Sequence, residues 1–253
     1  MPKTFALLGV VSAVLFALAD STMCHAQSAA GSASPSVACL KFKSGLSLGA
    51  PLPHTKAKLQ WGKNVTIVAL GSSSTTGFGS FGLGGAFPDV MKQELLQLRP
   101  TAKIALINSG RIMDDLEDNI ARIDDDVLRH KPDLVIWQLG TNDAVWRGIA
   151  DNAEEILGNA VKRLKGADVD VILMDLQYTP FVLVTGRYTR MEKIIADVAH
   201  QQKVGQFPRF LLMERAIAGG VTGLVSWDGL HNSAEGYRCI GIALGQMIDA
   251  ETR

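Results

Sequence analysis

Residues 65–77 read Val-Thr-Ile-Val-Ala-Leu-Gly-Ser-Ser-Ser-Thr-Thr-Gly. The first part, Val65–Leu70, is short, continuously apolar and rich in β-branched residues, which is typical of a parallel strand buried on both faces. The second part contains only Gly, Ser and Thr, the composition of a tight turn. A buried parallel strand that ends in such a turn places the turn at the carboxyl edge of a sheet, where ligands of open α/β sheets bind.

The same alternation continues along the chain. Further apolar runs predict four more strands, at Ile104–Ile107, Leu134–Leu139, Val169–Met174 and Phe210–Met213. Helical spacing of apolar residues predicts helices over Phe87–Leu98, Asp115–Leu128, Ala153–Leu164 and Tyr188–His200. A last helix follows Asn232, with Glu235 three residues later in a start that resembles a capping box. The order predicts an α/β fold with a doubly wound parallel sheet of about five strands.

The N-terminus has the features of a signal peptide over residues 1–26. Lys3 precedes an apolar run at Phe5–Leu18, and Cys24-His25-Ala26 fits a cleavage site after Ala26. An uncleaved anchor is the alternative, although the run is short for a membrane span. We expect residues 27–60 to form a leader and strap, and residues 61–253 to form one domain.

Cleavage would leave two cysteines, Cys39 and Cys239, in an oxidising periplasmic or extracellular compartment. They can pair and join the strap to the last helix, or remain two free thiols, since sequence alone does not place the two sulfur atoms. No CxxC motif and no His/Cys cluster occurs, so we predict no metal site.

The charge composition and one glycine motif indicate which classes of partner the protein does not bind. The 253 residues carry 25 Lys and Arg and 25 Asp and Glu, so no net charge attracts nucleic acid or an anionic membrane. Residues 77–82 fit G-x-G-x-x-G, but they begin several residues after the strand ends, unlike a dinucleotide fingerprint. We therefore expect no cofactor, no nucleic acid and no stable membrane insertion after signal cleavage.

The predicted carboxyl-edge loops carry the groups that ester hydrolysis needs. Ser73 supplies a hydroxyl, and His231 is the residue type that best takes its proton near neutral pH. Asp228 lies three residues before His231, near enough to orient the imidazole. The Ser73 and Gly110 amides and the Asn142 carboxamide are candidate donors to an oxyanion.

These blocks, Gly71-Ser72-Ser73, Asn108-Ser109-Gly110, Gly140-Thr141-Asn142-Asp143 and Asp228-Gly229-Leu230-His231, resemble those of the SGNH hydrolases, or GDSL-like esterases and lipases. The resemblance implies a flavodoxin-like three-layer α/β/α sandwich. It also implies Ser73 as nucleophile, Gly110 and Asn142 in the oxyanion hole, and Asp228 and His231 as the remaining catalytic pair. Ser72 departs from the family's usual Asp, and Met113 stands where a further Gly is common.

The sequence specifies the substrate less closely than it specifies the catalytic residues. An exported enzyme without a long apolar lid suits a short acyl group, and the resemblance favours acetyl esters on carbohydrate. The alternatives are a lipase, lysophospholipase or thioesterase for longer chains, acetyl transfer instead of hydrolysis, and a non-catalytic envelope or carbohydrate-binding protein. Trp146, Tyr178 and Trp227 are candidate substrate contacts near the predicted mouth of the site.

Overall fold

The centre of the fold is a five-stranded parallel sheet, seen in a computed structural model that describes residues 34–253. Its strands are β1 (Asn64–Gly71), β2 (Lys103–Gly110), β3 (Leu134–Gln138), β4 (Asp170–Met174) and β5 (Gly205–Phe207). They lie in the order β2-β1-β3-β4-β5, and every neighbouring pair is parallel. The order reverses between β1 and β3, as in a doubly wound sheet, which confirms the predicted fold class.

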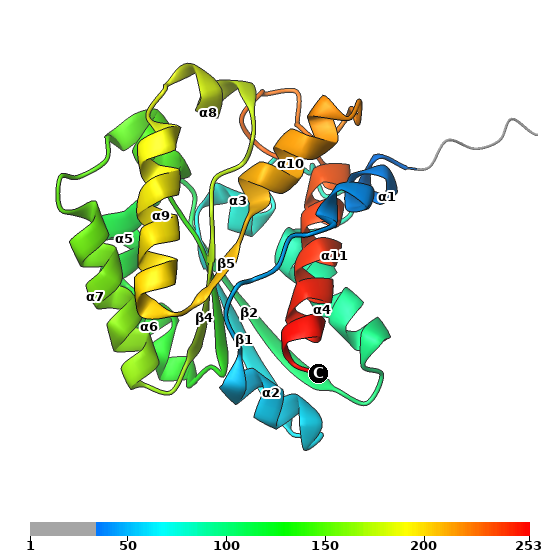
Figure 1. Ribbon diagram of the computed structural model, residues 1–253, viewed down its shortest axis with the longest axis vertical. Coiled ribbons are helices and arrows are strands. Elements are labelled where there is room, and N and C mark those ends of the chain that lie inside the picture. The colour runs from blue at the N-terminus through cyan, green and yellow to red at the C-terminus, as the bar shows by residue number, and fades with distance from the viewer. Residues whose placement is uncertain (1–33) are drawn as a thin grey trace, which may run out of the picture. The chain divides into compact units, whose positions relative to one another are not determined.

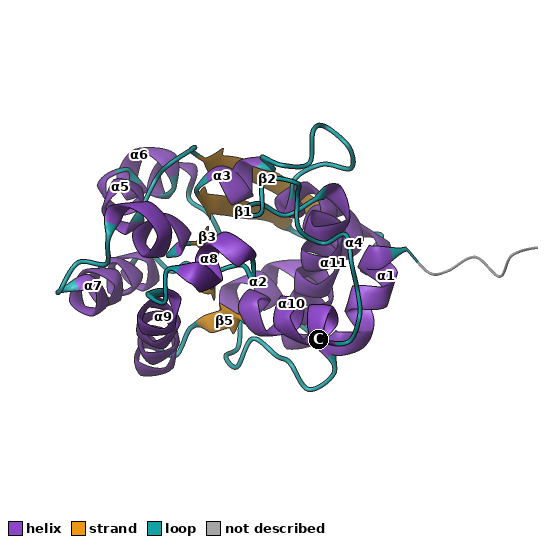
Figure 2. Ribbon diagram, turned by 90° about the horizontal axis from the view of Figure 1, so that it is seen from above, coloured by secondary structure: helices purple, strands orange, loops and turns teal. Residues whose placement is uncertain are grey.

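Helices cover both faces of the sheet, as Figures 1 and 2 show. One face carries α5 (Leu116–Ala121), α6 (Ile123–Asp126), α7 (Ala153–Gly166) and α9 (Tyr188–Gln202). The other carries α1 (Pro35–Leu40), α4 (Phe87–Leu98), α10 (Arg209–Ala218) and α11 (Ala234–Glu251). Three further helices, α2 (Pro53–Gln60), α3 (Ser73–Thr76) and α8 (Pro180–Val184), lie at the edges of the sheet.

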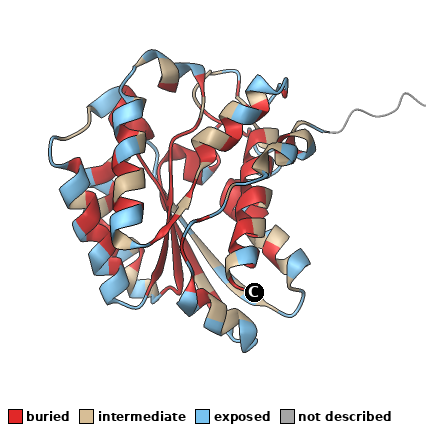
Figure 3. Cartoon of the chain, viewed as in Figure 1, coloured by how far each residue is buried: buried red, intermediate tan, exposed pale blue. Residues whose placement is uncertain are grey.

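β1, β2, β3 and β4 contribute to two hydrophobic cores because their side chains alternate between faces, whereas β5 contributes only Phe207, to the core under α4 and α11. In β1, Val68 and Leu70 join the core under α7 and α9, whereas Val65 and Ile67 join the core under α4 and α11. β1, β3 and β4 are therefore buried over most of their length (Figure 3), whereas every residue of the edge strand β2 is partly or fully exposed. Gly241 lets α11 approach α4 closely, since a Cβ atom there would lie 2.6 Å from the Cβ of Val90.

The predicted fifth strand is wrong. Phe210–Met213 belongs to α10, in which Leu212, Met213 and Ala216 are buried on one face at helical spacing. The true β5 is the three-residue segment just before it, with the polar Gln206 in the middle. A segment that is this short and interrupted by a polar residue gives no apolar run for a sequence pattern to detect.

Two helix boundaries also differ from the prediction. The helix expected over Asp115–Leu128 is interrupted at Arg122, which has a non-helical φ of −112° and whose side chain binds carbonyl oxygens at the ends of two strands. The last helix is capped by Ser233, whose side chain accepts from the amide of Gly236 at 3.1 Å, and not by Asn232.

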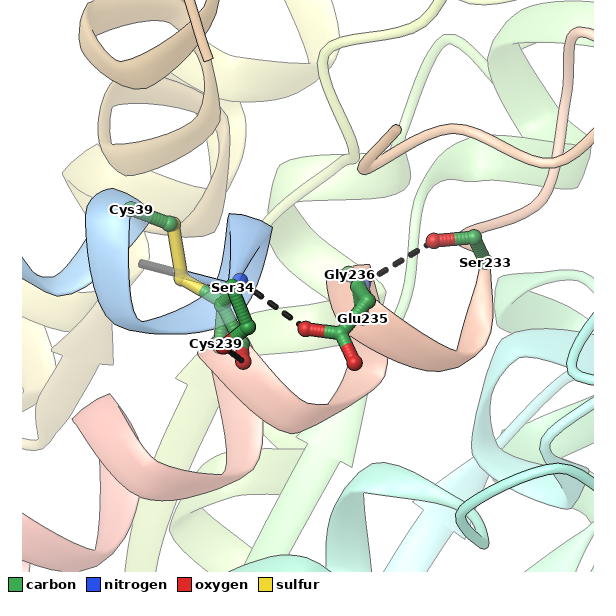
Figure 4. The surroundings of a disulfide bond; sticks show 7 residues. Ser34, Cys39, Ser233, Glu235, Gly236 and Cys239 are labelled. Atoms are coloured by element: carbon green, nitrogen blue, oxygen red, sulfur yellow. Dashed lines mark hydrogen bonds between the residues drawn. A yellow bond between two sulfur atoms is a disulfide. The ribbon is translucent and has the colours of Figure 1, made fainter. Parts of the chain in front are cut away.

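The strap belongs to the folded unit. Residues 34–60 contain α1 and α2, and a disulfide joins Cys39 of α1 to Cys239 of α11 across 6.1 Å between Cα atoms (Figure 4). Glu235 of α11, expected in a capping box, instead accepts a hydrogen bond from the Ser36 amide at 3.0 Å.

The predicted signal peptide lies outside the described residues. Within residues 34–253, no helix combines the length and the apolar character that a membrane span requires.

Candidate active site

Ser73 is the first residue of α3 and follows the end of β1 by a sharp turn. Gly71 makes this turn possible, because a Cβ atom there would lie 2.3 Å from Thr75 Oγ1 and 2.7 Å from the carbonyl oxygen of Gln138. The Ser73 side chain is thereby held at the carboxyl edge of the sheet, with 7 % of the residue exposed.

Gln138, at the end of β3, fixes this turn. Its Oε1 accepts hydrogen bonds from the Ser72 amide at 3.0 Å, from Ser72 Oγ at 2.9 Å and from Thr75 Oγ1 at 3.1 Å. Ser72 thus anchors the turn to the neighbouring strand although it replaces the Asp usual in the first block. Sequence reasoning missed Gln138, because a single polar residue at the end of an apolar run gives no signal of its own.

Residues 73, 228 and 231 form a continuous chain of hydrogen bonds. Ser73 Oγ lies 2.8 Å from His231 Nε2, and His231 Nδ1 lies 2.7 Å from Asp228 Oδ2. His231 is 9 % exposed, and the ring of Phe78 covers one side of it at 4.7 Å between ring centroids. The three residues therefore have the relative placement that activates a serine hydroxyl.

Asp228 is held by its own turn. Its Oδ1 accepts hydrogen bonds from the amides of Leu230 and His231, both at 2.9 Å. Partial burial alone would raise the pKa of Asp228, but these amides and the His231 ring lower the pKa below its ordinary value. The carboxylate is thus ionised and aimed at the imidazole at neutral pH.

The two remaining oxyanion candidates, Asn142 and Gly110, each donate a hydrogen bond within the protein. Asn142 is buried and uses one hydrogen of its amide on the Asp114 carbonyl at 2.8 Å; a carboxamide has two such hydrogens. Gly110 already donates its amide to Asn108 Oδ1 at 3.0 Å. Its Cα faces the backbone of α3, where a Cβ atom would lie 2.7 Å from the Thr76 nitrogen, so Gly110 lets β2 and α3 meet.

The loop after β2 has an unusual backbone at Met113, whose φ is +71°. This conformation favours glycine, and Met113 stands at the position where the family commonly has its further Gly. Arg122 secures the loop: its guanidinium binds Asp114 Oδ2 at 2.6 Å, the Ser109 carbonyl at 2.8 Å and the Gly71 carbonyl at 2.9 Å. Sequence analysis also missed Arg122, which lies inside an amphipathic pattern.

Asp143 holds the same loop from the other side. Its Oδ1 accepts from the Leu116 amide at 3.2 Å, at the start of α5. Burial raises the pKa of Asp143 to about 6, although the hydrogen bond from Leu116 opposes the shift. Its contacts are those of a residue that positions loops.

The three aromatic candidates have different surroundings. Tyr178 packs edge-on against Phe210 at 5.1 Å and borders the core, which are the contacts of a packing residue. Trp146 and Trp227 are exposed; Trp146 lies against Phe181 at 6.4 Å between ring centroids. Among residues 34–253, no group of three or more His, Cys, Asp or Glu side chains is placed to hold a metal ion.

Comparisons with known proteins identify the family of the chain. Residues 38–253 match the model of the Non-GDSL lipase-like family. The chain is 26 % identical over 204 residues to an acetylxylan esterase from Geobacillus stearothermophilus, covering 74 % of this chain and 91 % of that protein. It is 28 % identical over 128 residues to esterase TesA from Pseudomonas aeruginosa, covering 50 % of this chain and 60 % of that protein.

Solved structures show the same architecture. A lipase/acylhydrolase from Enterococcus faecalis aligns with a TM-score of 0.61 at 25 % identity, covering 74 % of this chain and 96 % of that one. The acetylxylan esterase structure from Geobacillus stearothermophilus aligns with a TM-score of 0.61 at 23 % identity, covering 73 % and 94 %. The chain therefore belongs to the Non-GDSL lipase-like family and is a carboxylester hydrolase of the SGNH type.

Proposed function

We propose that Ser73 is the nucleophile of this esterase, with His231 as its base and Asp228 as the residue that orients and stabilises the imidazole. The observation that carries the proposal is the unbroken hydrogen-bond chain from Ser73 Oγ through both ring nitrogens of His231 to Asp228 Oδ2. A hydroxyl is a weak nucleophile unless a base within hydrogen-bond reach takes its proton as it attacks.

The reaction follows from these contacts. His231 Nε2 takes the proton of Ser73 Oγ while the oxygen attacks the acyl carbon, and the imidazolium that forms is stabilised by Asp228. His231 then gives this proton to the departing alkoxide, which leaves an acyl-Ser73 ester and a free alcohol. Water, deprotonated by the same imidazole, attacks the acyl carbon and releases the acid, which restores the Ser73 hydroxyl.

The oxyanion of each tetrahedral intermediate needs donors in place before the reaction. The amide of Ser73 is the first of α3, and amides in the first turn of a helix have no partner within the helix. The Asn142 carboxamide is the second donor. The proposal assigns no donor role to Gly110, because its amide hydrogen is bound to Asn108.

A short acyl ester on carbohydrate is the proposed substrate class. The acetylxylan esterase relative supports it, since the alignment covers 91 % of that protein, and the exposed aromatic side chains near the site are suited to sugar rings. An ester with a longer acyl chain is the second candidate substrate, because aliphatic side chains such as Leu83 and Val184 are also exposed on the connections that leave the carboxyl edge of the sheet. A series of p-nitrophenyl esters separates the two: highest kcat/KM for acetate supports the first, and for octanoate or longer the second.

The catalytic assignment is tested with p-nitrophenyl acetate. Ser73→Ala removes the attacking oxygen, so we expect kcat to fall by at least about 10³-fold, whereas equal rates would refute the assignment. Labelling by a fluorophosphonate probe, present in the wild type and lost in Ser73→Ala, argues against a non-catalytic protein. Product analysis with an acceptor sugar separates hydrolysis from acetyl transfer.

The proposed location of the enzyme is the periplasm or the exterior of the cell, with residues 1–26 as the signal peptide that directs its export. The Cys39–Cys239 disulfide supports it, because structural disulfides persist in oxidising compartments. Fractionation of cells that express the full chain, with N-terminal sequencing of the product, is the test. A cytoplasmic protein that retains residues 1–26 would refute it.

A further inference from the structure

Large hydrophobic side chains are exposed mainly around the catalytic residues. Most of those exposed in residues 34–253 lie on the connections that leave the carboxyl edge of the sheet: Phe78, Phe81, Leu83, Ile112, Met113, Trp146, Phe181, Val184 and Trp227. Concentrated exposure of this kind marks a binding surface, whereas isolated hydrophobic residues on a surface are ordinary.

Within this rim, Phe81 and Trp227 form an ordered pair. Their rings lie nearly parallel, with an interplanar angle of 23° and 6.3 Å between centroids. The pair is nonetheless open to solvent, since Trp227 is 83 % exposed and Phe81 is 64 % exposed. Two aromatic rings that stack on each other and stay open to solvent leave an outer ring face to which a ligand can bind.

The position of Trp227 is set by the catalytic turn. Asp228 follows it, and Ser226, which precedes it, donates its amide to the His231 carbonyl at 2.8 Å and its hydroxyl to the Gly79 carbonyl at 3.2 Å. Trp227 thus lies between Ser226, which binds the backbone of His231, and Asp228, which binds its ring.

The position of Phe81 is set by the same contacts from the other side. Gly79 lies so close to the catalytic turn that a Cβ atom there would be 2.7 Å from His231 Cβ. Ser80 is buried and its hydroxyl binds the Gly77 carbonyl at 2.8 Å. Phe81 itself has a φ of +51°, a conformation that costs a bulky residue free energy and persists only where the surroundings impose it.

We propose that Phe81 and Trp227 form a stacking platform for a pyranose ring on the alcohol side of the ester, an inference that rests on the proposed function. The face of an aromatic ring carries partial negative charge, which attracts the C–H face of a pyranose. A sugar ring gains this contact through one face while its hydroxyls stay in water. An acyl chain gains most when it is enclosed, and a pair exposed to this extent does not enclose it.

The test compares two esters of the same acid. Acetylated xylotriose carries the sugar ring, and ethyl acetate does not. In Trp227→Ala, and separately in Phe81→Ala, we expect the ratio of kcat/KM for the xylotriose ester to kcat/KM for ethyl acetate to fall about three- to tenfold, mainly through KM for the sugar ester. Trp61→Ala is the matched control, since Trp61 is 76 % exposed and follows α2 at the opposite edge of the sheet; its ratio should equal that of the wild type.

The possible failures are distinguishable. Wild-type enzyme that hydrolyses ethyl acetate but not acetylated xylotriose would refute the proposed substrate class together with the platform. Wild-type enzyme that hydrolyses both, with the ratio unchanged in Trp227→Ala, would refute the platform alone. An equal fall in Trp227→Ala for ethyl octanoate relative to ethyl acetate would assign the pair to an acyl chain and overturn the inference.

Discussion

Replacement of Asp228 by Asn should nearly abolish turnover while leaving the fold intact. The Asn side-chain oxygen can keep both hydrogen bonds that Asp228 Oδ1 accepts from the backbone at 2.9 Å, so the turn survives. The third contact, 2.7 Å from Oδ2 to His231 Nδ1, then faces an NH₂ group. Since NH₂ can only donate, Nδ1 must accept, and the ring proton moves to Nε2, opposite Ser73 Oγ.

An imidazole that carries its proton on Nε2 cannot take one from the Ser73 hydroxyl. Serine hydrolases that lose the triad carboxylate in this way drop in kcat by about 10⁴-fold, equivalent to about 5.5 kcal/mol of transition-state stabilisation. Initial rates with p-nitrophenyl acetate measure the loss, and thermal unfolding confirms that the variant is folded. Asp89→Asn, at an exposed position at the start of α4, is the control. A folded Asp228→Asn variant with kcat within tenfold of wild type would refute the assignment of the base and its partner.

Three further predictions concern stability. Gly241→Ala should lower the free energy of unfolding by about 1–3 kcal/mol, because the added methyl group meets α4. Gly158→Ala in α7 should raise it by about 0.5–1 kcal/mol, because a Cβ atom there would meet only Gln202 Nε2, at an ordinary contact distance of 3.9 Å; urea titration compares the two variants. Replacing both Cys39 and Cys239 by Ala should lower the free energy of unfolding by about 2–4 kcal/mol. A reducing agent should then lower the unfolding midpoint of the wild type but not that of the double variant, and equal midpoints of the two proteins without reducing agent would contradict the prediction. Because burial raises the pKa of Asp143 to about 6, the contribution of Asp143 to stability should be lost as the pH rises from about 4 to 6. The Tm of Asp143→Asn minus that of the wild type should therefore increase over this range, and a constant difference would count against the prediction.

The fold was largely predictable because its strongest determinants are local. Long apolar runs such as Val65–Leu70 and Leu134–Leu139 can be buried on both faces only in a covered parallel sheet, and both form strands with boundaries within one residue of the prediction. The fifth strand was not predictable in this way. Gly205–Phe207 pairs with β4 through its backbone and contributes little apolar surface of its own, whereas the apolar run after it packs as a helix.

The candidate site likewise contains residues that the sequence predicts and residues that it does not. Ser73, Asp228 and His231 lie in short blocks whose residue types and order carry information, and the structure brings them together. Gln138 and Arg122 act through contacts 66 and 51 residues apart in sequence, with Ser72 and the Gly71 carbonyl respectively. Contacts of this range leave no periodic or local signature.

The guanidinium of Arg122 has a consequence for how the molecule opens. It binds backbone carbonyls at the ends of both β1 and β2, and the Arg111 amide also donates to the Gly71 carbonyl at 2.9 Å. Local fluctuations that expose one strand end must therefore break bonds to the other. In native-state hydrogen exchange, amides of the nucleophile turn and of the segment after β2 should form one cooperative unit with a shared opening free energy, and Arg122→Ala should split that unit in two.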